Sequence, residues 1–401
     1  MGKIGKNSLD IQESNRLSIL RILAGEDVLT RAELSRRTGL KQATITNIIN
    51  DFLASGVVSE TGALKGYLGR RSIGIRINAE KFNVVAIKIA RRSYSVGIFN
   101  IKNQLLEKEY QKLDPAAGAS AVLERIVSDA RSLMQKYGSC CAVGVAVPGP
   151  YLRREGRIAV MTEFAGWEKI DICKQLGAAF EQPVFVEHDA NAGALGEWSR
   201  SANIGRDDVL VHLLASEGIG AGVVIGGKII SGYRGIFGEI GHMSINRGCL
   251  EMYCSALALV RDVQAGLPEH PESSLTSEQK ITAEVIFRHM NAGDAYSRSA
   301  VLRTGHSLGC GVANLVNIYD PKEIVISDVM SGGGEVMLQA IREAAKERLL
   351  PEVWRDLTIR YSAVPEDLIL YGAASVAIDK ILEKTDAFSP SGADAPESKP
   401  L

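Results

Sequence analysis

The spacing of apolar and polar residues at the start of the chain predicts two short helices. Residues 15–25 place leucine and isoleucine side chains on one helical face, and a glycine closes the segment. Thr30 and Glu33 have the spacing of a capping box, in which each residue caps the other and a helix begins. Gly39 then ends this second helix, because glycine readily adopts the left-handed conformation of a helix terminus.

A third helix and a β-hairpin follow. Residues 41–55 repeat isoleucine, phenylalanine and leucine at helical spacing, and Gly56 ends the segment. Residues 57–78 alternate between apolar and polar positions around a glycine-containing turn, as a β-hairpin does. Three helices and a hairpin with a basic tip are the plan of a winged helix-turn-helix, which we expect to span residues 1–80.

From residue 81 onward, apolar β-rich runs alternate with helical stretches, which predicts an α/β body. We expect strand-forming runs at 84–90, 94–101, 141–149, 183–190, 208–216, 220–230 and 323–334, helices at 117–137, 168–180, from 191, within 276–319 and at 335–349, and a last α/β element at 361–382. Residues 385–401 are rich in serine, proline and charge, which predicts a disordered tail.

Composition limits the classes of protein to which the chain can belong. Hydrophobic residues make up 46% of the sequence and charged residues 23%, which is typical of a soluble globular protein. No apolar run reaches the roughly 18 residues of a membrane span. The first 15 residues also lack the apolar core of a signal peptide. We therefore expect a cytoplasmic protein without membrane insertion.

The net charge of −1 hides a difference between two parts of the chain. Residues 1–80 hold 12 basic and 8 acidic residues, a net charge of +4, whereas the remainder has a net charge of −5. A basic head on an acidic body favours an anionic partner for the head alone.

Polar side chains of the third helix and basic side chains at the hairpin tip are our candidate contacts to double-stranded DNA. Short donors and acceptors on one helical face reach base edges in a major groove, and basic residues of a wing reach phosphates or the minor groove. The candidates are Lys41, Gln42, Thr44, Thr46 and Asn47 of the helix, and Lys65, Arg70 and Arg71 of the hairpin. Because such proteins usually bind paired half-sites, we expect a homodimer or higher homo-oligomer. The alternative is a solvated helix face and a solvated basic turn.

Four stretches of the body resemble the ROK family, named for repressors, open reading frames and kinases, and they occur in that family's order. They are VAVPGPY at 145–151, VEHDANAGALGE at 186–197, GIGAGVVIGGKIISGYRGIFGEIGHMSI at 218–245, and GCLEMYCS at 248–255. The resemblance covers nearly all of residues 81–384, and GRRS at 69–72 is similar to the wing tip of the family's repressors.

The resemblance implies an actin-like, sugar-kinase-like body of two α/β lobes. The first lobe would span residues 81–195 and be completed by about 372–384. The second lobe would span 196–371 and contain the degenerate zinc motif, sugar-binding residues and the dimerisation region.

The resemblance also implies a sugar site. It places Asp189 at the family's catalytic base, beside His188, where the kinases usually have asparagine. It places Glu239, His242 and Glu251 on sugar hydroxyls. Carboxylates accept hydroxyl protons and imidazole donates or accepts, so this group suits a polyhydroxylated ligand. The alternative is that these acids form salt bridges in a cleft.

The phosphate-binding turns of the family's kinases are altered in this chain. The first, Asp-x-Gly-Gly-Thr-Lys, reads KIARRS at 88–93, so the metal-side acid and both glycines are lost. The second, Gly-Thr-Gly, reads SEG at 216–218, and a later Gly-Gly reads SD at 327–328. Because phosphates need bare backbone amides and Mg²⁺, we expect no kinase activity and no cofactor, with Asp189 as a vestigial base.

The zinc motif that the resemblance implies is incomplete. The family has a histidine followed by Cys-x-Cys-Gly-x-x-Gly-Cys, whereas here only His242 and Cys249 match, with no cysteine between them. A structural zinc site needs four nitrogen or sulfur ligands, and Cys254 would be a poorly placed substitute on a helix start. We expect no bound metal, and we expect packing of Met243, Ile245 and Leu250 to support this region.

These observations favour a transcription regulator of carbohydrate-related genes, most simply a repressor. A sugar or sugar phosphate in the kinase-like cleft would control it without phosphoryl transfer. One alternative is an active ATP-dependent sugar kinase with an appended DNA-binding head. The other is a regulator whose body only dimerises.

Overall fold

The computed structural model describes most of the chain between residues 8 and 383. The described residues are 8–65, 71–138, 140–159, 161, 166–201, 204–205, 207–245, 248–364 and 367–383, of which 8–10, 13, 63–65, 71–72, 115 and 383 are described by their backbone only. The tail expected to be disordered, 385–401, lies outside the described residues. In the described part of the chain, none of the helices is both long and apolar enough to cross a bilayer.

The head contains the helices and the hairpin that the sequence predicts. Its elements are α1 (Ser8–Gly25), β1 (Leu29–Thr30), α2 (Arg31–Thr38), α3 (Gln42–Ala54), β2 (Val58–Lys65) and β3 (Arg71–Ile77). The strands form an antiparallel sheet in the order β1-β3-β2. Helix α1 begins at Ser8 rather than at residue 15, because its mostly polar first turns contain no glycine or proline to interrupt it.

Local interactions fix the ends of α2 and so the position of α3. Thr30 Oγ1 accepts a hydrogen bond from the backbone N–H of Glu33 at 3.2 Å, and Glu33 Oε2 accepts one from the backbone N–H of Thr30 at 2.8 Å. The predicted capping box is therefore confirmed. Gly39, with φ of 73°, caps the other end. The head core is formed by apolar side chains of all three helices, including Ile19, Leu20, Leu34, Ile45, Ile49 and Phe52.

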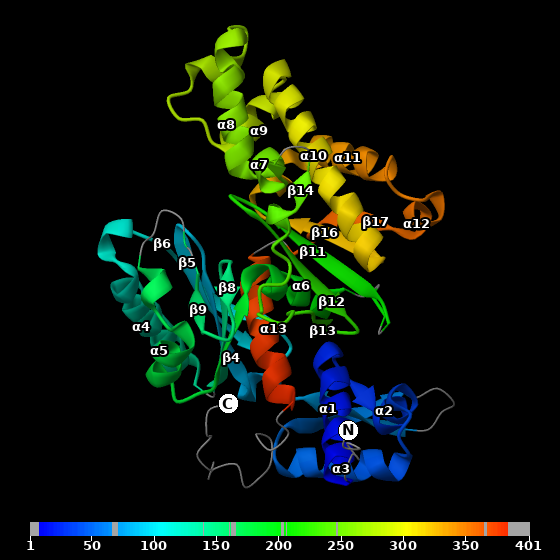
Figure 1. Cartoon of the computed structure of the whole chain (residues 1–401). Helices are drawn as coiled ribbons and strands as arrows, with labels where there is room; N and C mark the ends of the chain where they lie inside the picture. The colour runs from blue at the N-terminus through cyan, green and yellow to red at the C-terminus, as the bar shows by residue number, and fades with distance from the viewer. Residues whose placement is uncertain are drawn as a thin grey trace.

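The first lobe is built on a five-stranded sheet in the order β10-β7-β4-β5-β6. Its elements are β4 (Asn83–Ile89), β5 (Ser93–Asn100), β6 (Leu105–Lys112), α4 (Ala119–Tyr137), β7 (Cys140–Val147), the short hairpin β8 (Tyr151–Leu152) and β9 (Arg157–Ile158), α5 (Ile172–Ala179) and β10 (Val184–His188). Helices α4 and α5 share one hydrophobic cluster with the sheet (Figure 1). The sequence analysis missed β6, an edge strand whose side chains are mostly exposed.

The second lobe is built on another five-stranded sheet, in the order β13-β12-β11-β16-β17. Its strands are β11 (Val209–Ala215), β12 (Ile219–Ile225), β13 (Lys228–Ile229), β16 (Glu323–Ser327) and β17 (Thr358–Tyr361), with a separate pair β14 (Ser244–Ile245) and β15 (Gly248–Cys249). Its helices are α7 (Glu251–Cys254), α8 (Ala256–Gly266), α9 (Ala283–Asn291), α10 (Ala295–Tyr319), α11 (Gly334–Lys346) and α12 (Pro351–Asp356). Helices α8, α9 and α10 project at the top of Figure 1. The helix predicted to reach residue 349 ends at Lys346.

Two helices pack against each other between the sheets: α6 (Asp189–Arg200) and α13 (Leu368–Glu383). Helix α6 contacts β11 and β12 of the second sheet, whereas α13 contacts β4 and β7 of the first. The C-terminal end of α13 meets α1, so the head lies at the end of this helix (Figure 1). The chain therefore passes from one lobe to the other within α6.

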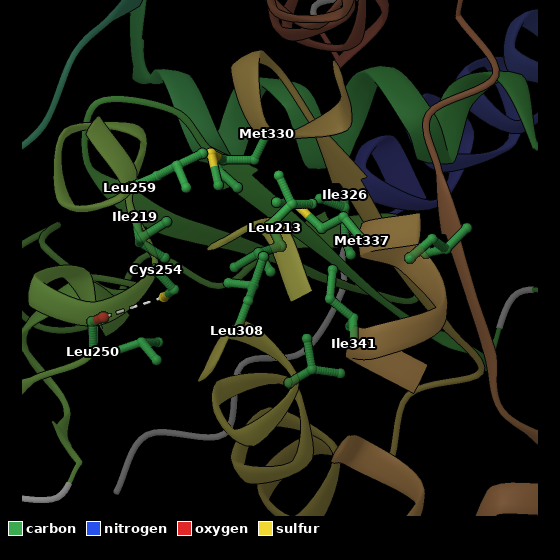
Figure 2. Packing of buried hydrophobic residues seen from close by; sticks show 14 of the residues in the cluster. Leu213, Ile219, Leu250, Cys254, Leu259, Leu308, Ile326, Met330, Met337 and Ile341 are labelled. Atoms are coloured by element: carbon green, nitrogen blue, oxygen red, sulfur yellow. Dashed lines mark hydrogen bonds between the residues drawn. The ribbon is translucent and has the colours of Figure 1, made fainter. Parts of the chain in front are cut away.

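Figure 2 shows the core between the second sheet and its helices, where Leu213, Leu308 and Met337 lie among other apolar side chains. Full burial of a leucine or methionine side chain contributes about 1.5–3 kcal/mol. Leu250 and Cys254 belong to this cluster. Met243 and Ile245 pack against this cluster. The three residues expected to support the region of the zinc motif by packing therefore do pack in the core.

Candidate functional site

Five residues predicted to hold a sugar lie where the two lobes meet, and we call them the inter-lobe site: His188, Asp189, Glu239, His242 and Glu251. His188 is the last residue of β10 and Asp189 the first of α6. Loops and helix starts at the carboxyl end of strands are the usual ligand positions of α/β sheets. His188 Nε2 lies 3.1 Å from Asp189 Oδ1, which also accepts the backbone N–H of Ala190 at 2.7 Å.

Glu239 directly precedes a 3₁₀ turn at Ile240–His242, and His242 is the last residue of this turn. Glu239 Oε1 is 3.9 Å from His188 Nε2, so the second lobe reaches the first at this point. Gly149, in the loop after β7, lies against the same two side chains. A Cβ there would overlap the His188 imidazole and lie 2.8 Å from Glu239 Oε1, so a larger residue at position 149 would displace these two side chains.

Glu251 begins α7 and reaches the turn between β11 and β12. Its Oε2 accepts a hydrogen bond from the backbone N–H of Ile219 at 3.3 Å. A Cβ on the neighbouring Gly218 would lie 3.1 Å from the same oxygen. Glu251 therefore lies at the end of the inter-lobe site that faces one of the altered phosphate turns.

The carboxyl groups of the inter-lobe site influence one another. Burial raises the pKa of Asp189, and the opposing effect of His188 is smaller. Burial also raises the pKa of Glu239, with Asp189 and Glu251 acting in the same direction and His188 and His242 opposing it. The structure thus brings the predicted residues within electrostatic reach of Glu239.

Glu187, which is only 3% exposed, was not among the residues predicted for the site. Its Oε1 accepts from the backbone N–H of His188 at 3.0 Å and from Asn191 Nδ2 at 3.1 Å, and its Oε2 accepts from Arg153 Nη2 at 2.7 Å. Arg153 Nη1 also donates to Ser231 Oγ of the second lobe at 2.7 Å. These contacts hold the end of β10 and connect the lobes. Glu187 could have been identified from the sequence as an acidic residue in a predicted strand, directly before His188.

His212 was not predicted for the site either, and it connects α6 to β16. Its Nδ1–H donates to the carbonyl of Ala190 at 2.9 Å, and its Nε2 accepts from the Ser327 hydroxyl at 2.7 Å. Burial lowers the pKa of His212, which favours the neutral imidazole that this pattern requires. His212 therefore positions the start of α6, where Asp189 lies.

Lys88 begins the stretch that the sequence predicts to be an altered phosphate turn, and its ammonium group is paired with a carboxylate. Lys88 Nζ donates to Asp367 Oδ1 at 2.8 Å, and Ser95 Oγ donates to Asp367 Oδ2 at 3.3 Å. Burial alone would lower the pKa of Lys88, but Asp367 and Asp328 outweigh it, so the pKa lies above its ordinary value. The ammonium group therefore stays charged.

The first and second altered turns meet each other across the lobes. Arg91 and Arg92 lie between β4 and β5, and Glu217 lies between β11 and β12. Arg92 Nε is 3.1 Å from Glu217 Oε1, and Arg91 Nη1 is 3.8 Å from Glu217 Oε2. Charged side chains thus meet at the two turns for which the sequence predicts loss of phosphate binding.

The third altered turn keeps a glycine-like backbone without the glycine. Asp328 has φ of 72° and ψ of −154°, a region almost restricted to glycine. Its Oδ1 accepts from the backbone N–H of Val329 at 2.7 Å and from Ser216 Oγ at 3.0 Å. Asp328 therefore holds a backbone conformation that glycine adopts more readily than aspartate.

The remaining residues of the zinc motif do not fit a zinc ion. His242 ends the 3₁₀ turn, Cys249 ends β15, and Cys254 is buried in the hydrophobic core. Burial raises the pKa of Cys254, whose thiol donates to the carbonyl of Leu250 at 3.1 Å, whereas zinc binds the thiolate. Among the residues that the structure describes, no group of three or more His, Cys, Asp or Glu is arranged to hold a metal.

Helix α3 presents the predicted DNA contacts to solvent. Lys41, Gln42, Thr46 and Asn47 are exposed and Thr44 is partly buried. The opposite face is buried in the head core through Ile45, Ile48, Ile49 and Phe52. Of the wing candidates, Lys65 and Arg71 are described by their backbone only, and Arg70 lies outside the described residues.

The N-terminus of α3 is open to an anion. Its N-cap residue, Lys41, makes no side-chain capping bond. The first N–H groups of a helix lack partners within the helix and, with the helix dipole, favour negative charge. Arg16, Arg31 and Arg37 pair with carboxylates of the head, whereas no carboxylate of a described residue pairs with Lys41.

Comparison with known proteins agrees with both parts of the molecule. A winged helix-turn-helix DNA-binding model matches residues 12–59, and the ROK family model matches residues 84–380. The xylose repressor of Caldicellulosiruptor bescii is 26% identical over 94% of this chain and 98% of its own length. The glucokinase of Thermotoga maritima is 27% identical over 75% of this chain and 99% of its own length.

The fold is also found in a crystal structure of a ROK family transcriptional regulator, described as a homologue of the E. coli MLC protein. It superposes with a TM-score of 0.79 at 22% identity, covering 93% of this chain and 97% of that one. The molecule is thus a winged helix-turn-helix joined to a two-lobed, sugar-kinase-like body. The chain belongs to the ROK family.

Proposed function

We propose that the protein is a DNA-binding transcription regulator, most simply a repressor of carbohydrate-related genes. A sugar held at the inter-lobe site controls its DNA binding without phosphoryl transfer. The observation that carries the proposal is a contrast within one region: the predicted sugar residues converge, whereas the altered phosphate turns are filled by charged side chains that pair with one another. Such a site suits the binding of a sugar as an effector rather than the transfer of a phosphoryl group to it.

The head supplies the DNA-binding side of the proposal. The exposed polar face of α3 has the size and chemistry of a major-groove reader, and the uncapped helix start beside Lys41 suits a phosphate. The relative from Caldicellulosiruptor bescii, named a xylose repressor, matches this chain over almost its entire length, head included. Because winged helix-turn-helix repressors read paired half-sites, we expect a dimer or higher oligomer on DNA.

The inter-lobe site supplies the effector side. Asp189, Glu239 and Glu251 provide carboxylate oxygens, and His188 and His242 provide ring nitrogens that donate or accept. A sugar has several hydroxyl groups that each donate and accept, so it satisfies this set better than an apolar ligand does. The name of the xylose repressor relative is consistent with a sugar effector.

Phosphoryl transfer is disfavoured by electrostatics. Transfer needs Mg²⁺ and backbone amides around the phosphates. Lys88 replaces the metal-side acid, and Glu217 and Asp328 add negative charge at the other two turns. The resemblance to glucokinase therefore concerns the body's fold and sugar site, and a kinase with a DNA-binding head is the outcome that the test below must exclude.

Calorimetric titration with D-xylose, D-glucose and N-acetylglucosamine tests the proposal. We expect one of these sugars to bind the native protein, and Glu239→Gln to weaken that binding about tenfold or more, because a charge-assisted hydrogen bond is lost. Glu335→Gln, which changes an ion-paired glutamate on α11, is the matched control and should bind normally. Absence of sugar binding, or sugar-dependent ADP formation from ATP that Asp189→Ala abolishes, would overturn the proposal.

A further inference from the structure

A cation–carboxylate cluster closes one end of the inter-lobe site. Arg91 and Arg92 of the first lobe converge on Glu217 of the second, with contacts of 3.8 and 3.1 Å. The side chain of Glu217 is 23% exposed and that of Arg91 is 28% exposed, so water screens their contact only in part. We call these three residues the inter-lobe latch.

The inter-lobe latch lies next to the predicted sugar residues. A Cβ on Gly218 would lie 3.1 Å from Glu251 Oε2 and 3.2 Å from Arg91 Nη2. The carboxylate of Glu251 and the guanidinium of Arg91 therefore flank the same glycine. Arg91 and its partner Glu217 therefore lie beside Glu251, one of the predicted sugar residues.

The positive charges of Lys88, Arg91 and Arg92 around the latch are matched by nearby carboxylates. Lys88 is paired with Asp367, and both arginines face Glu217. Asp328 accepts from Ser216 of the same turn and adds a further negative charge. A phosphate group needs cations and N–H donors that are free to turn toward it, and nearby carboxylates repel it.

We propose that the inter-lobe latch makes the effector site specific for sugars that have no phosphate group, and that Glu217 is the residue that determines this specificity. Glu217 contacts both arginines and offsets one of their two positive charges, so less positive charge is left to attract a phosphate. The same contacts hold the two lobes together where the kinases of the family hold nucleotide phosphates. The proposal rests on the proposed function, because it concerns the ligand of the same site.

Removing the charge of Glu217 tests the latch by a gain of binding. We expect the native protein to bind a free sugar, D-glucose or N-acetylglucosamine, and to bind its 6-phosphate at least tenfold more weakly, as measured by calorimetry. Glu217→Gln should remove the carboxylate that contacts Arg91 and Arg92 and improve binding of the 6-phosphate and of inorganic phosphate roughly tenfold. Adding Arg91→Ala and Arg92→Ala to Glu217→Gln should abolish this gain.

Glu335→Gln on α11, also paired with an arginine, is the matched control and should leave phosphate binding unchanged. A native protein that binds the 6-phosphate as tightly as the free sugar overturns the latch proposal while the proposed function stands. Glu217→Gln that binds free sugar but gains no phosphate binding overturns it too. A native protein that binds neither form, and that also fails to bind D-xylose, removes the proposed function itself.

Discussion

Asp328 occupies a backbone conformation that glycine tolerates and aspartate does not favour. With φ of 72° and ψ of −154°, its Cβ costs about 1–3 kcal/mol. Hydrogen bonds from Val329 N–H and Ser216 Oγ to its carboxylate offset part of that cost. The side chain therefore stabilises a turn whose backbone strain it also causes.

Replacing Asp328 by alanine or glycine separates these two effects. Both variants lose the carboxylate, but only the alanine variant keeps a Cβ. We expect the free energy of unfolding of Asp328→Gly to exceed that of Asp328→Ala by about 1 kcal/mol, measured by urea denaturation. At Glu347, where φ is an ordinary −61°, the order should reverse, since glycine costs more backbone entropy. Equal stability of the two Asp328 variants would show that the turn is unstrained.

Asp189 should give the protein a pH-dependent stability. Burial raises the pKa of Asp189 in the folded protein, so the folded state binds more protons than the unfolded state between the two pKa values. Stability therefore falls as pH rises through this window. We expect Asp189→Asn to be more stable than the native protein near neutral pH, and the difference to shrink as pH falls toward the unfolded pKa of about 4.

Urea denaturation at several pH values measures this difference. Asp356, whose side chain is 81% exposed at the end of α12, provides the control, and Asp356→Asn should show no comparable gain near neutral pH. A native protein at least as stable as Asp189→Asn near neutral pH would contradict the argument.

At the scale of elements, α3 combines a buried face with an exposed face that can read bases. Gln42 is its first residue, and its exposed amide has the donor and acceptor that match adenine in the major groove. We expect Gln42→Ala to relax preference at one base position at a cost of about 1–3 kcal/mol. Binding to single-base variants of an operator selected from random duplexes measures this, and an equal loss on all sequences would contradict the assignment.

The wing provides the contrasting element in the same assay. Replacing Arg70 and Arg71 by alanine should weaken binding to all sequences alike, because phosphate contacts have no sequence information. The salt dependence of binding should also become flatter, since fewer counterions are released.

Elements with local signals could be predicted from the sequence. The capping box of Thr30 and Glu33 and the terminal Gly39 depend on residues a few positions apart, and the structure has both. Strand β6 escaped prediction because its edge position leaves most side chains exposed, so its apolar pattern is weak. Helix α1 was predicted too short for a similar reason: its first turns are mostly polar.

The inter-lobe site could be predicted only where motifs mark it. The EHDAN and GEIGH motifs located His188, Asp189 and Glu239. The pairing of Lys88 with Asp367, 279 positions apart, depends on how α13 packs beside the first sheet, and no local pattern indicates it. The contact between Glu217 and the two arginines likewise depends on the relative position of the lobes.

At the scale of the whole molecule, one helix connects the inter-lobe site with the head. Helix α13 begins after Asp367, which pairs with Lys88, and its far end shares a hydrophobic cluster with α1 (Figure 1). Arg21 of α1 lies 3.8 Å from Asp379 of α13. A cavity of about 430 Å³ lies between α1, α6 and α13.

This arrangement suggests how a sugar would alter DNA binding. We propose that a change in lobe closure would move α13 relative to α1, and that a dimer with displaced heads would no longer match its half-site spacing. The sugar acts only to the extent that it binds the two arrangements with different affinity.

Fluorescence anisotropy of the selected operator duplex, titrated with the bound sugar in the absence of nucleotide, tests this control most directly. We predict that the sugar alone weakens operator binding by about tenfold or more, that ATP and Mg²⁺ leave the shift unchanged, and that no ADP forms. If the sugar does not change operator binding, or changes it only while ATP is consumed, the protein is not a regulator that senses a sugar without phosphorylating it.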